Sequence, residues 1–375
     1  MKRILSLLLV MVLILTLAVG CSKPKDADGD ETPDTDQTDA VEDEGTEEPA
    51  SGNITKVGLG HVASIAKSKD AEEDEAAVAQ ADLTIAAVGF DEEGKVVSVT
   101  IDTAQTKVEF DEDLKVASDR AERPKSKKEL KEDYGMKSVS EQMGIGKEWY
   151  EQIEALEEWM VGKTVDEIKN MKVVERDEAH IAVPDEPDLT SSVTITVESY
   201  IDAVAEAWEN TVDVENGATV GLGLITSIGN SKDPEDGNGP VARMDTTMTA
   251  TAFDEEGVVV GTIIDTAQIK VEYDAEGKVI SDKDAEIKTK HELKEDYGMK
   301  SVSEQMGIGK EWYEQMNALQ EWMVGKTVDE IVNMKVVERD EDHPAIPDEP
   351  DLTSSVTITV EAYLEVVELA SKAAK

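Results

Sequence analysis

The stretch LKEDYGMKSVSEQMGIGKEWYEQ occurs twice, letter for letter, at 130–152 and at 293–315 of this 375-residue chain. The two copies stand 163 residues apart, and the same offset relates Phe90 to Phe253 without a gap. A repeat of this length, present in two copies, is typical of tandem domains rather than of a solenoid, because each unit is large enough to close a core. The chain is therefore one unit written twice.

Drift between the copies marks the edges of the repeated unit. SKDAEEDEAAVAQ at 68–80 faces SKDPEDGNGPVAR at 231–243, whereas the centre of the unit is unchanged. We place the boundary between the copies in ENTVDVENGAT at 209–219. The sequence predicts one domain at 52–210 and a homologous domain at 217–375.

Strand signals come first in each unit and helical signals follow. Three stretches of the first copy alternate apolar and polar residues and are bounded by turns. Ser126 and Glu129 then form a capping box, and GKEWYEQIEALEEWMVG at 146–162 has apolar residues at helical spacing. Strands followed by helices predict an α+β fold, with a small antiparallel sheet and helices in each domain. The three strand stretches are 81–90, 95–104 and 106–110.

Individual caps and turns add detail to this prediction. Gly135 is a natural helix stop, and Thr164 can cap a short helix over TVDEIKNMKV. Gly277 is suited to the positive φ of a hairpin turn at 274–279. VESYIDAVAEAW at 197–208 carries an apolar helical face.

The first twenty residues form a targeting segment. Lys2 and Arg3 precede an apolar run at 4–17, which is short for a stable membrane span and is not followed by a stop-transfer charge cluster. We therefore predict a signal peptide at 1–20. Cys21 follows this segment directly, and one interpretation is that it is an incidental cysteine after an ordinary signal peptide.

Cys21 is the only cysteine, so an internal disulfide is excluded. LAVGC at 17–21 resembles the bacterial lipobox, in which the cysteine becomes the lipid-modified first residue of a mature lipoprotein. This resemblance implies an anchor at Cys21 on the extracytoplasmic face of the cell membrane. Acyl chains at about 0.8 kcal/mol per buried methylene make such an anchor stable once more than one chain is attached.

The segment 21–51 is predicted to be a disordered acidic linker. Residues 22–50 contain twelve Asp or Glu and two Lys, too little apolar surface to offset the entropy of ordering. The whole chain has a formal net charge of −47, which argues against nucleic acid as a partner and against direct adsorption on anionic lipid. If a protein partner exists, we expect it to be cationic or bridged by metal.

A second identical stretch, DEPDLTSSVTITVE, occurs at 185–198 and 348–361, just ahead of a predicted helix. Its hydroxyl residues alternate with apolar ones as in a half-buried strand, or Ser191 or Thr194 caps the helix. A helix start also favours a bound anion, because its backbone N–H groups are free. The four histidines are too few to indicate a Ser-His-Asp triad.

This stretch resembles the flavinylation motif of FMN-binding domains of the NqrC and RnfG type, which also occur in flavinylated extracellular electron-transfer lipoproteins of Gram-positive bacteria. In that family an Asp precedes Ser-Gly-Ala-Thr, and a flavin transferase esterifies the Thr with the phosphate of FMN. The chain has Ser-Val where the family has Gly-Ala. The resemblance implies covalent FMN on Thr194 and Thr357, two groups in all. The accompanying motif residues are Asp188, Ser191 and Ser192, and Asp351, Ser354 and Ser355.

The isoalloxazine ring of FMN needs apolar or aromatic walls and a few hydrogen bonds. Gln105 and Gln268 are candidates to donate to the ring, with a surface strand amide as the equal alternative. For each candidate wall residue, plain core packing is the stronger reading. These residues are Tyr134, Met136, Trp149 and Tyr150, and in the second copy Tyr297, Met299, Trp312 and Tyr313.

Two functions remain open at this point. The resemblance implies a membrane-anchored electron carrier that takes electrons from a membrane quinol or flavin donor and passes them to extracellular acceptors, without a specific substrate of its own. The alternative is a non-catalytic binding or adhesion lipoprotein whose duplication gives avidity. Metal capture by the acidic surface is a third, weaker hypothesis. No ligand spacing of the EF-hand kind occurs in the repeats, and DADGDE at 26–31, which mimics the start of such a loop, lies in the linker and is rejected as a site.

Overall fold

The computed structural model describes residues 53–178, 180–341 and 343–375. The predicted signal peptide, Cys21 and the acidic linker lie outside these residues. Within the described part of the chain, no helix combines the length and apolar character needed to cross a membrane.

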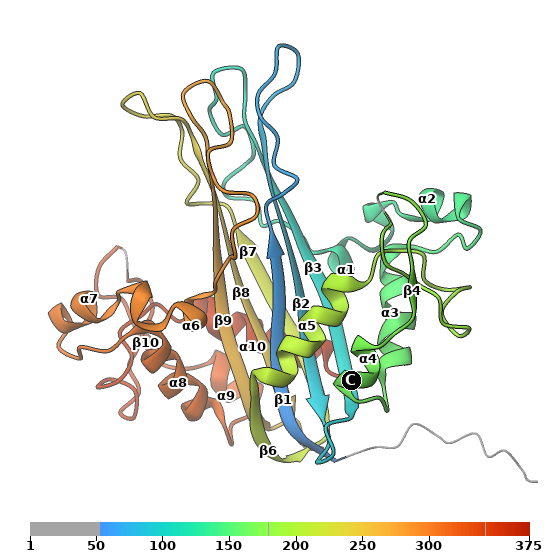
Figure 1. The fold of residues 1–375 in the computed structure, drawn as a ribbon. Coiled ribbons are helices and arrows are strands. Elements are labelled where there is room, and N and C mark those ends of the chain that lie inside the picture. Colours follow the sequence, from blue (N-terminus) through green and yellow to red (C-terminus); the bar gives the residue numbers. More distant parts are fainter. Residues whose placement is uncertain (1–52, 179, 342) are drawn as a thin grey trace, which may run out of the picture. The chain divides into compact units, whose positions relative to one another are not determined.

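Each repeat is built on an antiparallel sheet, with helices in the segments that follow its long strands (Figure 1). The strand order is β3-β2-β1-β6 in the first sheet and β7-β8-β9 in the second. The α+β prediction is therefore confirmed. The bounds of these strands are β1 (Ile54–Ser64), β2 (Val78–Phe90), β3 (Val96–Glu109), β6 (Thr211–Gly217), β7 (Thr219–Ser227), β8 (Val241–Phe253) and β9 (Val259–Glu272).

The helices come in matching sets, one set from each repeat. In the first repeat they are α1 (Lys127–Leu130), the 3-10 helix η1 (Lys131–Tyr134), α2 (Lys137–Gln142), α3 (Trp149–Met160), α4 (Val165–Lys169) and α5 (Glu198–Glu209). In the second they are α6 (Lys290–Leu293), η2 (Lys294–Tyr297), α7 (Lys300–Gln305), α8 (Trp312–Met323), α9 (Val328–Val332) and α10 (Glu361–Ala373). Two-residue strands form a small ladder in each repeat: β4 (Val173–Val174) with β5 (Val183–Pro184), and β10 (Val336–Val337) with β11 (Ile346–Pro347).

The predicted helix caps and the helix stop in the middle of the first repeat are confirmed. The Ser126 hydroxyl accepts from the backbone N–H of Glu129, whose carboxylate accepts from the Ser126 N–H in return. Thr164 caps α4 in the same way. Gly135 ends η1 with a φ of 76°, and Gly277 has a φ of 78° in its hairpin turn. The stretches at 95–104 and 106–110 form one long strand, β3, followed by a bridging residue, rather than two strands.

The two sheets pack against each other and share an apolar core. Alternate residues of β1 and β2, such as Val57 and Leu83, point into this core and meet residues of β7 and β8, such as Leu222 and Met248. The opposite face of each sheet is covered by the helices of its own repeat, in a second and a third core. The molecule thus has four layers, with helices outside and two sheets inside (Figure 1).

An approximate two-fold axis relates the repeats. Phe110 and Tyr273, which occupy equivalent positions, contact each other with ring centroids 5.1 Å apart, as only residues near such an axis can. The Asp70 carboxylate accepts from the backbone N–H of Val279 at 2.9 Å, and Asp233 accepts from Val116 at 3.0 Å. Each repeat therefore caps a hairpin of the other.

The long helix that closes each repeat lies directly on glycines of the first strand of that repeat. A Cβ atom at Gly58 or Gly60 would come within 2.0 Å of a carbonyl oxygen of α5. At Gly221 and Gly223 the same clash with α10 would occur at 1.8 Å. Only glycine allows this close helix-on-strand packing.

The predicted boundary segment is a structural element. Residues of β6 pair antiparallel with β1, so the segment between the copies extends the sheet of the first repeat. The described residues of both repeats form one compact unit. The two predicted domains thus pack together through their sheets.

Candidate functional site

The hydroxyl-rich stretch forms a compact turn rather than a strand. Backbone N–H groups of Ser192 and Val193 both donate to the carbonyl of Leu189 at 2.8 Å. Leu189 and Val193, four residues apart, are buried in the outer core of the first repeat. Val193, which departs from the family pattern, therefore serves as an anchor for the turn.

The helix cap expected in this stretch is also absent. The N-cap residue of α5 is Val197, and no side chain caps the helix there. The N-cap of α10, Val360, is likewise without a side-chain cap. The predictions of a half-buried strand and of a Ser191 or Thr194 cap are both wrong, because the turn presents these hydroxyls before the helix begins.

Thr194 and Thr357 have the same surroundings in the two repeats. Each donates its backbone N–H to a glutamine side-chain oxygen at 2.9 Å, and its hydroxyl lies 3.3 Å from that oxygen. The glutamines are Gln152 and Gln315, which are completely buried. Both threonine residues are partly exposed, and each hydroxyl lies against the side-chain oxygen of its glutamine.

The other motif residues lie at the surface of the turn. Ser192 and Ser355 are partly exposed, whereas the remaining four are exposed: Asp188, Ser191, Asp351 and Ser354. Two residues after each candidate threonine, the hydroxyls of Thr196 and Thr359 are buried without a hydrogen-bond partner among the described residues.

The candidate wall residues divide into two kinds. Trp149 is 1% exposed and donates its indole N–H to the hydroxyl of Tyr200 at 3.0 Å, so core packing is the correct interpretation for it and for Trp312. The others are partly exposed and lie at the border of the outer cores: Tyr134, Met136 and Tyr150, and Tyr297, Met299 and Tyr313.

A lysine lies over these aromatic rings in each repeat. The Lys127 ammonium is 4.9 Å from the ring centre of Tyr134 and 5.1 Å from that of Trp149. Lys290 has matching contacts in the second repeat. Burial lowers the pKa of Lys127 to about 8, and the charge of Lys67 adds to the effect while Asp82 opposes it.

Gln105 participates in a polar network rather than lying free on its strand. Its side-chain N–H donates to Asp82 at 2.9 Å, and its oxygen accepts from the hydroxyl of Tyr134 at 3.3 Å. Gln268, its counterpart, is partly exposed on β9. Gln105 thus links a strand carboxylate to the partly exposed aromatic residue.

A cavity of about 590 Å³ lies away from both hydroxyl stretches, between the two repeats. It is bounded by β1, by the end of α5 and start of β6, and by β9, α6 and α8 of the second repeat. Its polar lining includes His61, Glu206, Asp265, Thr289, His291 and Glu292.

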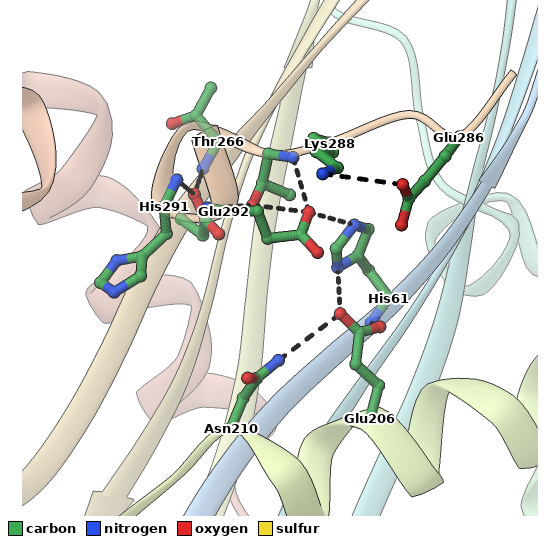
Figure 2. Close-up of polar contacts among 10 residues, drawn as sticks. His61, Glu206, Asn210, Thr266, Glu286, Lys288, His291 and Glu292 are labelled. Atoms are coloured by element: carbon green, nitrogen blue, oxygen red, sulfur yellow. Dashed lines mark hydrogen bonds and ion pairs between the residues drawn. The ribbon is translucent and has the colours of Figure 1, made fainter. Parts of the chain in front are cut away.

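Three side chains in this cavity converge on one another (Figure 2). The His61 Nδ1 atom is 3.1 Å from a Glu206 oxygen, and its Nε2 atom is 3.5 Å from a Glu292 oxygen. Glu206 also accepts the backbone N–H of His61 at 2.7 Å, on a stretch of β1 beyond its pairing with β6. The ring of His291 points away from this group (Figure 2).

The charge state of His61 follows from these neighbours. Burial by itself lowers the pKa of His61, but the hydrogen bond and charge of Glu206 and the charges of Glu292 and Asp265 more than offset it. The pKa of His61 is therefore raised above its ordinary value. One protonated imidazole can bridge the two repeats by pairing with a carboxylate from each.

Sequence reasoning missed this group because its members come from β1, α5 and α6, far apart in the chain. One signal was available. At the positions equivalent to His61 and Glu206 the second repeat has Leu224 and Leu369, so polar groups replace apolar ones in one copy alone.

Comparisons with known proteins do not identify a family. No protein-family model, no curated protein and no solved structure matches the chain.

Proposed function

We propose that the protein is a membrane-anchored extracytoplasmic electron carrier with one covalent FMN on Thr194 and one on Thr357. The observation that carries the proposal is the identical presentation of the two threonines, each partly exposed and fixed by a buried glutamine. A hydroxyl with defined orientation and access from solvent is what a transferase needs for esterification.

The surroundings suit a phosphate at this position. The α5 and α10 helices start a few residues later without a side-chain cap, so their first backbone N–H groups and their positive dipole ends favour an anion. Two residues after each attachment point, the hydroxyls of Thr196 and Thr359 have no partner among the described residues and are further candidate donors. These features fit the phosphate end of FMN.

When bound, FMN would supply electron transfer in steps of one or two electrons. The chain would hold its phosphate through Thr194 and place Tyr134 and Met136 as candidate neighbours of the ring, since both are partly exposed. Gln105, already fixed by Asp82, is the candidate donor to a polar edge of the ring. Anchoring through Cys21 would keep the carrier near a membrane quinol or flavin donor.

The test is intact-mass spectrometry of the full chain after co-expression with a flavin transferase. We expect two FMN-sized additions, one lost in Thr194→Ala and the other in Thr357→Ala, with visible flavin absorbance reduced by half in each. Thr190→Ala, an exposed hydroxyl of the same turn, is the matched control and should keep both additions. An unmodified mass beside an active transferase refutes the proposal.

A second candidate function is a binding lipoprotein without a flavin. It is favoured by one observation, the 590 Å³ cavity between the repeats, which is large enough for a small ligand and lies away from the threonines. The mass experiment separates the two, because a binding protein predicts a colourless, unmodified chain.

A further inference from the structure

We propose that His61, Glu206 and Glu292 form a binding site for a divalent transition metal of the Zn²⁺ class, held between the two repeats. The site is independent of flavin attachment. It uses one nitrogen and two carboxylate oxygens, all within 4.8 Å of one another.

The ligand set selects the type of metal. Imidazole nitrogen is a poor ligand for Ca²⁺ and Mg²⁺, which prefer oxygen, whereas one nitrogen with carboxylates suits Zn²⁺ and its neighbours. Tetrahedral bonds of about 2.1 Å place ligand atoms roughly 3.4 Å apart. For each ring nitrogen of His61 one carboxylate oxygen already lies at about this separation, Glu206 at 3.1 Å from Nδ1 or Glu292 at 3.5 Å from Nε2.

Binding requires a small rearrangement, because Glu206 and Glu292 now face different nitrogens of the His61 ring. The metal uses one nitrogen, so one carboxylate or the ring must rotate to bring the atoms from 4.8 Å or less to the bonding separation. The nitrogen that binds the metal must be free of a proton, so metal binding competes with protonation of the ring.

Two of the ligands are already oriented by backbone contacts. Glu206 accepts the His61 N–H at 2.7 Å, and Glu292 accepts the N–H of Thr289 at 2.8 Å. Such contacts limit the rotamers of a ligand and are a regular part of metal sites.

The fold does not require these residues, as the equivalent place on the other side of the axis shows. There Leu224 and Leu369 replace His61 and Glu206. The third position keeps its carboxylate, Glu129, but Arg123 pairs with it at 2.6 Å. The fold therefore forms equally well with two leucines at this position as with the converging His61, Glu206 and Glu292 at the other.

The cavity gives the site an open side. Three protein ligands leave one position of a tetrahedral metal for water or another ligand. The 590 Å³ space, bordered also by Asp265, Thr289 and Asn210, has room for either.

The experiment is calorimetric titration of the full chain, freed of metal by a chelator, with ZnCl₂ alone near pH 7.5 at physiological ionic strength. We expect one site of micromolar or tighter affinity. His61→Leu, which installs the residue found at the equivalent position, should weaken that site by about ten-fold or more. Glu206→Gln should also weaken it.

His343→Asn is the matched control, because His343 is a partly exposed histidine that contacts the carboxylate of Asp340 at the surface. It should leave the high-affinity site unchanged. Circular dichroism checks that each variant folds, and Glu206→Gln serves if His61→Leu does not. The proposal is overturned if zinc binds wild type and a folded site variant equally, as adsorption to the acidic surface would, or does not bind at all.

The outcome is independent of the flavin proposal. Zinc titration uses chain produced without a flavin transferase, so an unmodified Thr194 has no bearing on it. Loss of the zinc site would leave the mass experiment untouched, and an unmodified mass would leave the zinc site untouched.

Discussion

The two edges at which the repeats meet are equivalent by the approximate two-fold axis, yet they differ in chemistry. At the open edge, β1 lies beside β9 and the cavity contains His61, Glu206 and Glu292. At the closed edge, β7 lies beside β3, and Glu157 pairs with Lys128 at 2.6 Å and with Lys375 at 2.7 Å.

The residue exchanges explain the difference. Glu157 of the closed edge corresponds to Gln320 of the open edge, and Lys128 corresponds to His291. Both Glu157 and Gln320 accept a backbone N–H of the neighbouring edge strand at 2.6 Å, so that structural role is kept. At this pair of positions the two edges differ only in charge, because Glu157 pairs with lysines and Gln320 is neutral. Packing is thus the same at both edges, although only one of them has a polar cavity.

The largest expected effect concerns what the two edges still share, the glycines under α5 and α10. Gly60→Ala and Gly223→Ala should each lower the free energy of unfolding by about 3 kcal/mol, because the added carbon overlaps helix backbone. Urea unfolding of each variant provides the measurement. A large loss at one edge and none at the other would show that the packing is not equivalent.

The next effect tests the ion pairs of the closed edge. Glu157→Gln keeps an oxygen for the Ile101 N–H but removes the charge facing Lys128 and Lys375. It should lower the free energy of unfolding by about 2 kcal/mol, after allowance for the partial exposure of Lys128 and the exposure of Lys375. Urea unfolding at low and high salt measures this loss. Gln320→Asn, shorter at the equivalent open-edge position, should show no salt-dependent component.

A smaller effect is the pH dependence of stability that Lys127 of the first repeat should contribute. Burial lowers the pKa of Lys127 to about 8, and Lys67, which adds to this, is Asn230 in the other repeat. Above this pKa the Lys127 side chain has lost its proton in the folded state but keeps it in the unfolded state. The free energy of unfolding should therefore rise with pH. Between about pH 7.5 and 9, wild type should gain about 1 kcal/mol relative to Lys127→Met.

Chemical denaturation of both chains across this range measures the difference. Lys67→Asn should raise the pKa of Lys127 and shrink the gain. A gain that is the same in wild type and Lys127→Met would mean that other groups titrate.

The smallest effect concerns the exposed pair of Arg123 with Glu129. Arg123→Glu installs the residue found at the equivalent open-edge position, Glu286, and should cost less than about 1 kcal/mol, because the pair is exposed to solvent. A thermal melt detects it. A loss of several kcal/mol would mean that this pair, rather than Glu157, closes the edge.

Local features of the fold could be predicted from the sequence because they depend on near neighbours. The capping boxes at Ser126 and Thr164 and the turn at Gly277 need only residues within one turn of the chain. The hydroxyl stretch was misread for the opposite reason. Its alternation suggested a strand, but burial of Leu189 and Val193, four residues apart, selected a turn.

The packing of sheet on sheet was less accessible, although β2 contained a sign of it. Most residues of β2 are buried, on both faces of the strand, which fits a sheet covered on both sides. The cavity group needed knowledge of three distant segments and of the approximate symmetry axis. The sequence contained one sign of this group: His61 and Glu206 of the first repeat correspond to Leu224 and Leu369 of the second.

The reciprocal contacts across the axis have an evolutionary consequence. A single repeat by itself would expose the apolar sheet face that now meets its twin, so two separate copies would be expected to pair with two identical edges. In such a dimer every substitution is made twice. In one continuous chain the two edges can differ, and here one edge has ion pairs while the other has a polar cavity.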